Sequence, residues 1–177
     1  MNAKTKILDD AIGVLQAGGP LTIDSVARAA GLTKPGVVHH FRTKEVLTES
    51  VVDRIADRWE AGMAARTPAG SSPVQRLRAC VEYALSSSFD QSDLALMADV
   101  KLRDQLCRRW VERLDPWFGM GIDGPVRRRA RLRAARAIAD GAWFNRSLGI
   151  PITRPDEDDE VLAIALELLD ENEGVNP

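Results

Sequence analysis

The stretch that decides the fold reads IDSVARAAGLTKPGVVHHF and covers residues 23–41. Its apolar residues recur at helical spacing, and Ala27 is small enough to let two helices pack closely at the turn between them. Gly31 accepts the left-handed backbone of a tight turn, and Thr33 is placed to cap a second helix. Pro35 falls in the first turn of that helix, where its missing N–H costs no hydrogen bond. The stretch therefore predicts two short helices joined by a tight turn, the helix-turn-helix motif.

Helical periodicity continues outside this motif, and we find no segment that alternates polar and apolar residues as a strand does. Before the motif, a helix is expected to end at Gly18, and after it Thr43 is expected to cap a long helix. The apolar stripe of the earlier helix is Ile7, Leu8, Ala11, Ile12 and Leu15, and that of the long helix is Leu47, Val51, Ile55, Trp59 and Met63. The long helix is expected to end before a loop over residues 67–73.

Later segments extend the same pattern towards the end of the chain. The remaining helices are expected around residues 77–85, 94–118, 126–148 and 157–171. The sequence thus predicts an all-α fold of about nine helices. We place a helix-turn-helix domain at residues 1–45 and a larger helical domain at residues 46–177.

The distribution of charge points to a partner. The 177 residues carry a formal net charge of −2, which does not by itself favour a nucleic acid. Between Arg28 and Lys44, however, there are four Lys or Arg residues, two histidines and no Asp or Glu. The N-terminal end of the second helix in such a motif enters the DNA major groove, and its free N–H groups favour a phosphate. This basic window therefore predicts a DNA-binding surface.

Several other functions find no support in the sequence. No GxSxG, P-loop or HExxH motif is present, so we predict neither an enzyme nor a cofactor. His39 and His40 are neighbours that point about 100° apart on a helix, so no metal site is expected. Cys80 and Cys107 are expected to be free thiols. The polar N-terminus and the lack of a long apolar run predict a cytoplasmic protein. An all-helical interaction protein that never contacts DNA is the alternative.

From about Ile7 to Leu47 the sequence resembles the tetracycline-repressor family of bacterial regulators, most closely over GLTKPGVVHHFRTKEVL, residues 31–47. Phe41 at the end of the recognition helix and Lys44 at the start of the next helix are the most specific part of the match. The resemblance implies a homodimer that binds a near-palindromic DNA operator. It further implies release from that operator by a small-molecule effector, with repression as the usual direction of control and activation as the other.

The resemblance also assigns DNA contacts residue by residue. Thr33 and Lys34 match phosphate or base contacts, and Lys44 matches a lysine that grips the DNA backbone. Val38 stands where the family commonly has a tyrosine that bonds a phosphate, so either affinity comes from elsewhere or Val38 touches a thymine methyl. Gly36 matches a groove-facing or packing position. The predicted DNA-binding residues are Arg28, Thr33, Lys34, Gly36, Val38, His39, His40, Thr43 and Lys44.

Large apolar and aromatic side chains in the second domain either fill its core or line a pocket, and the resemblance implies an effector pocket there. Few polar groups lie among them, which favours an apolar or aromatic effector. The predicted ligand-binding residues are Trp59, Met63, Tyr83, Met97, Trp110 and Trp117.

Small and apolar residues of the helices around 126–148 and 157–171 predict a face that pairs with a second copy, or that packs within one chain. That face comprises Ala134, Ala135, Ile138, Ala139, Ala142, Trp143, Ile164, Ala165, Leu168 and Leu169. The arginine run at residues 127–136 is interpreted as a solvated helix face that pairs in part with the acidic stretch 156–160. A second nucleic-acid surface is the other interpretation.

Overall fold

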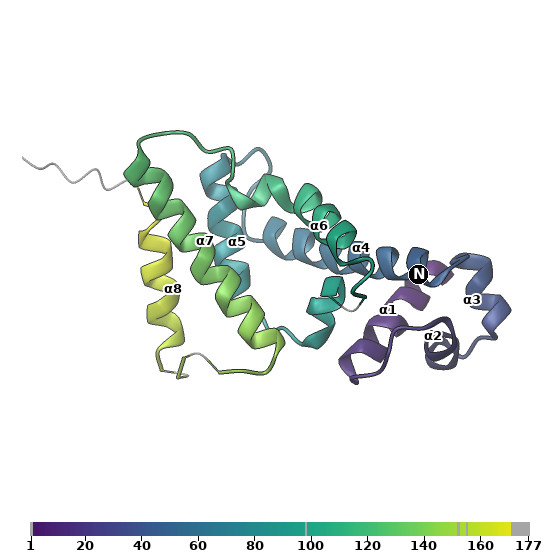
Figure 1. The fold of residues 1–177 in the computed structure, drawn as a ribbon. Coiled ribbons are helices and arrows are strands. Elements are labelled where there is room, and N and C mark those ends of the chain that lie inside the picture. Colours follow the sequence, from purple (N-terminus) through teal and green to yellow (C-terminus); the bar gives the residue numbers. More distant parts are fainter. Residues whose placement is uncertain (1, 98, 152, 155, 171–177) are drawn as a thin grey trace, which may run out of the picture. The chain divides into compact units, whose positions relative to one another are not determined.

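The computed structural model describes residues 2–97, 99–151, 153–154 and 156–170, and these contain eight α-helices, one 3-10 helix and no strand (Figure 1). The predicted all-α fold is confirmed. The chain forms two compact units. The first unit comprises residues 1–59, 89–113 and 147–149, and the second comprises 60–88, 114–146 and 150–177. No helix in the described part of the chain is both long and apolar enough to cross a membrane.

The first unit begins with three short helices, α1 (Ala3–Gln16), α2 (Ile23–Ala30) and α3 (Lys34–His40). All five residues of the predicted α1 stripe are buried. Helix α2 packs against both α1 and α3. It begins with a capping box in which Thr22 and Ser25 each accept a backbone N–H of the other, at 3.0 Å in both directions. Local caps and one apolar face per helix therefore explain how these residues form short helices that pack on one another.

Helix α4 (Lys44–Ala64) follows, and the predicted cap is present because the Thr43 hydroxyl accepts the Val46 N–H at 3.3 Å. Every residue of the predicted α4 stripe is buried. Residues up to Trp59 belong to the first unit and the rest of the helix belongs to the second.

The prediction of one helix over residues 94–118 is wrong about where the helix begins. A 3-10 helix, η1 (Gln91–Met97), is followed by a turn, and α6 begins at Arg103 and ends at Phe118. The turn is held by Asp99, whose carboxylate accepts the Lys101 N–H at 3.0 Å and whose carbonyl accepts the Leu102 N–H at 3.1 Å. An aspartate that bonds the backbone two residues ahead favours a turn over a helix.

The second unit contains α5 (Pro73–Ser86), α7 (Val126–Ser147, up to Arg146) and α8 (Asp158–Glu167). Its core lies between α5, which packs on α8, and the inner face of α7. The buried side chains include Leu77, Cys80, Val81, Ala84, Ala135, Ala139, Ala142, Ala165 and Leu169. Cys80 and the half-buried Cys107 are both free thiols, and burial raises the pKa of Cys80 to about 11.

Candidate nucleic-acid interface

Helix α3 is held in place by its inner face and leaves its outer face accessible. Gly31 ends α2 with a φ of 66°, the left-handed conformation expected at the turn. The Thr33 hydroxyl then accepts the Gly36 N–H at 3.2 Å and caps α3, as predicted. Val37 and Phe41 are both fully buried and anchor the helix. The opposite side of α3 is thereby free to meet a partner.

The nine predicted DNA-binding residues are all accessible from solvent. Gly36 and His40 are half-buried and the other seven are exposed. Val38, in the place of the family's usual tyrosine, is 38% exposed, which is compatible with an apolar contact to a base. Leu32, in the turn between α2 and α3, is 43% exposed and so does not fill the corner between the two helices.

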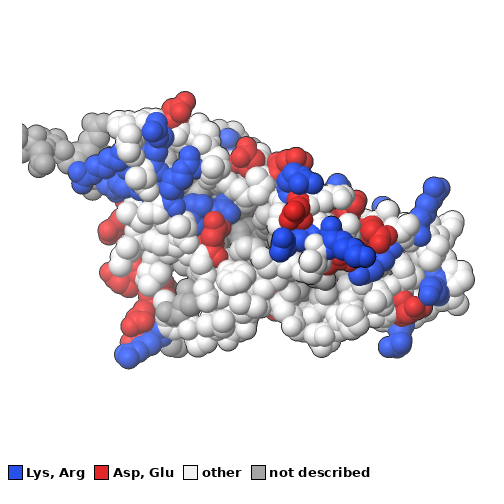
Figure 2. Space-filling model, viewed as in Figure 1, with Lys and Arg blue, Asp and Glu red and all other residues white. Residues whose placement is uncertain are grey.

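Two of the predicted DNA contacts have carboxylate partners within the chain. Lys34 Nζ lies 3.0 Å from Asp24 Oδ2, and both side chains are exposed. Lys44 Nζ lies 2.8 Å from an oxygen of the Asp99 carboxylate, which comes from the turn before α6. Figure 2 shows Lys and Arg side chains spread over the region of α2 and α3 rather than gathered into one dense patch.

Family models match most of the described chain. A model of bacterial regulatory proteins of the tetR family matches residues 7–51. A model of the tetracyclin repressor-like C-terminal domain matches residues 74–170, which is more than half of the chain. The chain belongs to the tetR family. Members are transcription regulators with a helix-turn-helix DNA-binding part and a ligand-binding part, so the resemblance seen in the sequence is confirmed.

Solved structures share the fold of this tetR family regulator at low sequence identity. The multidrug binding protein EbrR, complexed with imidazole, has 17% identity and a TM-score of 0.61, with 96% of each chain covered. A protein from Shewanella sp. PV-4 described as a tetR family transcription regulator has 14% identity and a TM-score of 0.58, again with 96% of each chain covered. No curated protein sequence matches the chain.

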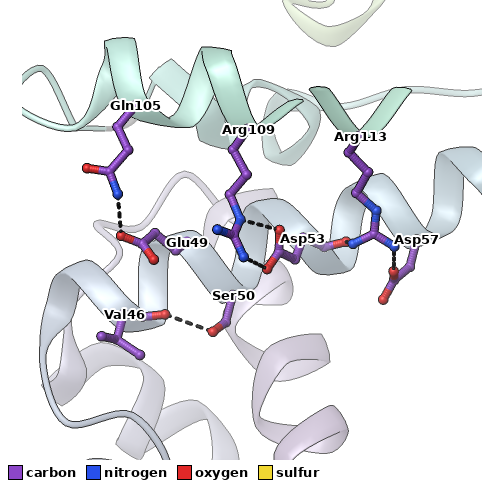
Figure 3. Close-up of polar contacts among 8 residues, drawn as sticks. All are labelled: Val46, Glu49, Ser50, Asp53, Asp57, Gln105, Arg109 and Arg113. Atoms are coloured by element: carbon purple, nitrogen blue, oxygen red, sulfur yellow. Dashed lines mark hydrogen bonds and ion pairs between the residues drawn. The ribbon is translucent and has the colours of Figure 1, made fainter. Parts of the chain in front are cut away.

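A series of contacts that the sequence analysis missed joins α4 to α6 behind the interface (Figure 3). We call these contacts the α4–α6 ladder: Gln105 donates to Glu49 at 2.7 Å, Arg109 donates twice to Asp53 at 2.6 and 2.7 Å, and Arg113 donates to Asp57. The signal for it was present. Acids recur every four residues on α4, and Gln or Arg recurs every four residues on α6, as facing helix surfaces require.

Helix α1 is also fixed to α4 by charge. Asp9 accepts two hydrogen bonds from Arg54, at 2.9 and 3.2 Å, and a third from Arg58 at 3.3 Å. The hydrogen bonds from Arg54 hold the pKa of Asp9 below its ordinary value, although partial burial opposes the shift. Within the first unit, α4 is therefore connected to α1 as well as to α6.

The predicted ligand-binding residues are divided between the two units. Trp59 stacks on Phe89 at 5.3 Å and meets the edge of Trp110 at 5.5 Å, all within the first unit. Met97 also belongs to the first unit and is half exposed. In the second unit, Met63 is fully buried, whereas Tyr83 and Trp117 are half-buried.

Two hollows in the described structure are lined by other residues. One, of about 370 Å³, lies in the first unit beside Lys44, Thr48, Asp99 and the loop before α2. The other, of about 50 Å³, lies in the second unit beside Phe118 and three arginines of α7. Among the described residues, no three His, Cys, Asp or Glu side chains are grouped as a metal site would need.

Five members of the predicted pairing face pack inside the second unit, which is the within-chain packing that the sequence left open: Ala135, Ala139, Ala142, Ala165 and Leu169. A different side of α7 is accessible. Its residues, which we call the α7 stripe, follow one another at intervals of three, four or seven residues, so they share one side of the helix: Val126, Ala130, Ala134, Ala137 and Phe144. Ala134 is the one residue that the α7 stripe shares with the predicted pairing face. Alanines lie on several sides of α7, so their pattern alone does not say which side is buried.

The arginine run of α7 makes contacts that its sequence did not indicate. Arg131 donates to the Leu168 carbonyl at 3.2 Å, near the C-terminal end of α8, where carbonyls lack helical partners. Arg136 pairs with Asp140 at 2.6 Å and lies 3.4 Å from the Phe118 ring centre. Asp158, in the acidic stretch 156–160, pairs at 3.4 Å with Arg146, which lies outside the arginine run 127–136. The described contacts of this run thus tie α7 to its own unit.

Proposed function

We propose that this tetR family regulator is a repressor that binds a near-palindromic operator as a homodimer and leaves it when a small-molecule effector binds. The proposal rests on how α3 is presented: the helix is capped, is anchored through Val37 and Phe41, and is accessible along its other side. A helix presented in this way can lie in the major groove with its N-terminal end towards the bases.

The contacts follow from the position of each side chain. Thr33 and Lys34 at the start of α3 reach bases or phosphates, and Val38 meets a thymine methyl. Arg28 and Lys44, on the helices either side of α3, contact phosphates. His39, His40, Gly36 and Thr43 complete the proposed surface. Phosphate contacts fix the position on DNA, whereas the few groove-facing side chains of α3 supply the sequence preference.

The second copy is proposed to pair through the α7 stripe and the exposed Ile164 of α8. Val126 is 72% exposed and Phe144 is 39% exposed. Exposed apolar side chains that share one side of a helix often mark a surface that binds another protein. Alanines between them let a second helix approach closely. A two-fold dimer of this kind places two recognition helices one helical turn of DNA apart, about 34–36 Å.

The proposed effector is apolar or aromatic and contacts some of the six residues predicted for ligand binding, with Trp59 and Trp110 as the leading candidates because they already form an aromatic cluster. Similarity to a multidrug binding protein is consistent with such a ligand. Trp59 lies on α4, which carries Lys44 at its other end. An effector that favours one position of α4 would change the fraction of protein able to bind DNA.

Selection from a random-sequence DNA library tests the proposal. The wild-type protein should enrich an inverted repeat whose half-sites are centred about ten base pairs, or a multiple of that, apart. The control is a Thr33→Ala, Lys34→Ala variant, which should lose the enrichment while retaining its helical circular dichroism. Enrichment of an identical sequence by the control would remove α3 from the role of reader. No enrichment by the wild-type protein would favour the interaction-protein alternative.

A further inference from the structure

The ion pair between Lys44 and Asp99 occupies the ammonium group that the proposed function assigns to DNA. Lys44 Nζ lies 2.8 Å from Asp99 Oδ2. The two residues are 55 positions apart in the chain, so their contact reflects the fold rather than local sequence. A lysine expected to bind phosphate is thus already bound to a carboxylate when no DNA is present.

Asp99 is the more rigidly placed partner. Its other carboxylate oxygen accepts the Lys101 N–H at 3.0 Å, and its side chain is only 17% exposed. The hydrogen bond from Lys44 is the main reason that the pKa of Asp99 lies below its ordinary value, so the carboxylate stays charged at neutral pH. The Lys44 side chain is 43% exposed and borders the hollow of about 370 Å³, which gives the ammonium group space to leave Asp99.

We propose that Asp99 competes with a DNA phosphate for Lys44 and thereby lowers the affinity of the protein for DNA. If Lys44 turns to the phosphate, the ion pair with Asp99 is lost. If it bridges both anions, the carboxylate and the phosphate lie one ammonium group apart and repel each other. In both arrangements, removing the charge of Asp99 strengthens DNA binding. The inference rests on the proposed function only in assuming that Lys44 contacts DNA.

The position of Asp99 links this competition to α6. Asp99 lies four residues before α6, and the α4–α6 ladder begins at Gln105, two residues after the start of α6. Movement of the start of α6 relative to α4 would therefore alter the Lys44–Asp99 distance. We infer that this turn can set DNA affinity electrostatically, by holding or releasing one cation.

The test compares Asp99→Asn with wild-type protein in fluorescence anisotropy titrations on a selected operator and on non-specific DNA, each at two salt concentrations. Asparagine keeps an oxygen for the Lys101 N–H, and Asp99→Ser offers a second variant that keeps such an acceptor. Exposed ion pairs typically change an equilibrium constant by about 1.4- to fivefold, so DNA binding by Asp99→Asn should tighten by an amount in this range. Asp104→Asn, which removes the same charge at the start of α6 from a side chain that is 78% exposed, is the matched control and should bind as wild type does.

A Lys44→Ala background isolates the mechanism. The gain from Asp99→Asn should disappear once Lys44 is absent, so that Asp99→Asn then behaves as Asp104→Asn does. Unchanged or weaker binding by Asp99→Asn, or an equal gain in the Lys44→Ala background, would overturn the inference. Failure of the proposed function looks different: the wild-type protein would lack specific binding, while the competition would still be measurable on non-specific DNA at low salt. Absence of all DNA binding at low salt would overturn both.

Discussion

Gly62 lies in the last turn of α4 and faces the ring of Tyr83 on α5. A Cβ added at this position would lie 2.1 Å from Tyr83 Cε2 and 2.6 Å from Cδ2, far inside van der Waals contact. The ring cannot shift without cost, because the Arg66 guanidinium lies over it at 5.0 Å. Gly62→Ala therefore tests whether α4 and α5 approach as closely as described within the second unit.

Three effects set the expected size of the change. Alanine gains up to about 1 kcal/mol in helix propensity over glycine. Overpacking costs about 1–3 kcal/mol, and a weakened contact between Arg66 and Tyr83 costs about 0.5–1 kcal/mol more. Gly62→Ala should therefore lower the free energy of unfolding by about 1–2 kcal/mol, which corresponds to a fall in Tm of roughly 2–8 °C in a chain of this size.

Thermal unfolding followed by circular dichroism, at one fixed protein concentration, measures the effect. Gly13→Ala is the matched control, because Gly13 lies inside α1 and its added Cβ would meet nothing within 4 Å. The control should raise Tm by a few degrees through helix propensity alone. In a Tyr83→Ala background, Gly62→Ala should likewise become stabilising. A rise in Tm for Gly62→Ala equal to that of Gly13→Ala would refute the described packing of Tyr83 on α4.

Three further predictions concern charge and assembly. Burial raises the pKa of Asp93 to about 6, so the ionised form of Asp93 destabilises the fold above that pH. The free energy of unfolding should therefore increase as pH falls from about 7 towards 4. Asp93→Asn should remove this increase in urea titrations across the same pH range. Ala137→Glu should place a charge on the α7 stripe and weaken dimerisation at least tenfold, as measured by sedimentation velocity. Ala61→Glu, at an exposed position of α4, should leave dimerisation unchanged. Equal effects of the two substitutions would exclude the α7 stripe as the interface. Lys44→Ala should weaken binding to all DNA sequences and lower the salt slope by about one, and an unchanged slope would contradict a phosphate contact.

The parts of the fold that were predicted from sequence are those decided locally. Thr33 and Gly31 act on atoms a few residues away, so their capping and turn roles can be read without knowing the rest of the structure. The same holds for the apolar stripes of α1 and α4, since one side of each helix is clearly more apolar than the other.

The parts that were missed depend on contacts between distant segments. Asp99 ends a helical pattern because its carboxylate bonds the backbone ahead, and the apolar spacing of this region hides the turn. The side of α7 that is buried is decided by α5 and α8, because alanines lie on several of its sides. Sequence spacing could have suggested the acids of α4 and the arginines of α6 as partners, but only the fold brings the two helices together.

The stoichiometry of binding to the selected operator shows whether two copies of the chain read DNA together through α3. Labelled operator at a concentration well above Kd should be titrated with protein in the presence of excess non-specific DNA. Binding should saturate at two chains per operator, survive the competitor and be lost in the Thr33→Ala, Lys34→Ala variant. Loss of all binding to the competitor, or saturation that the variant reproduces, would contradict a dimer that reads DNA through α3.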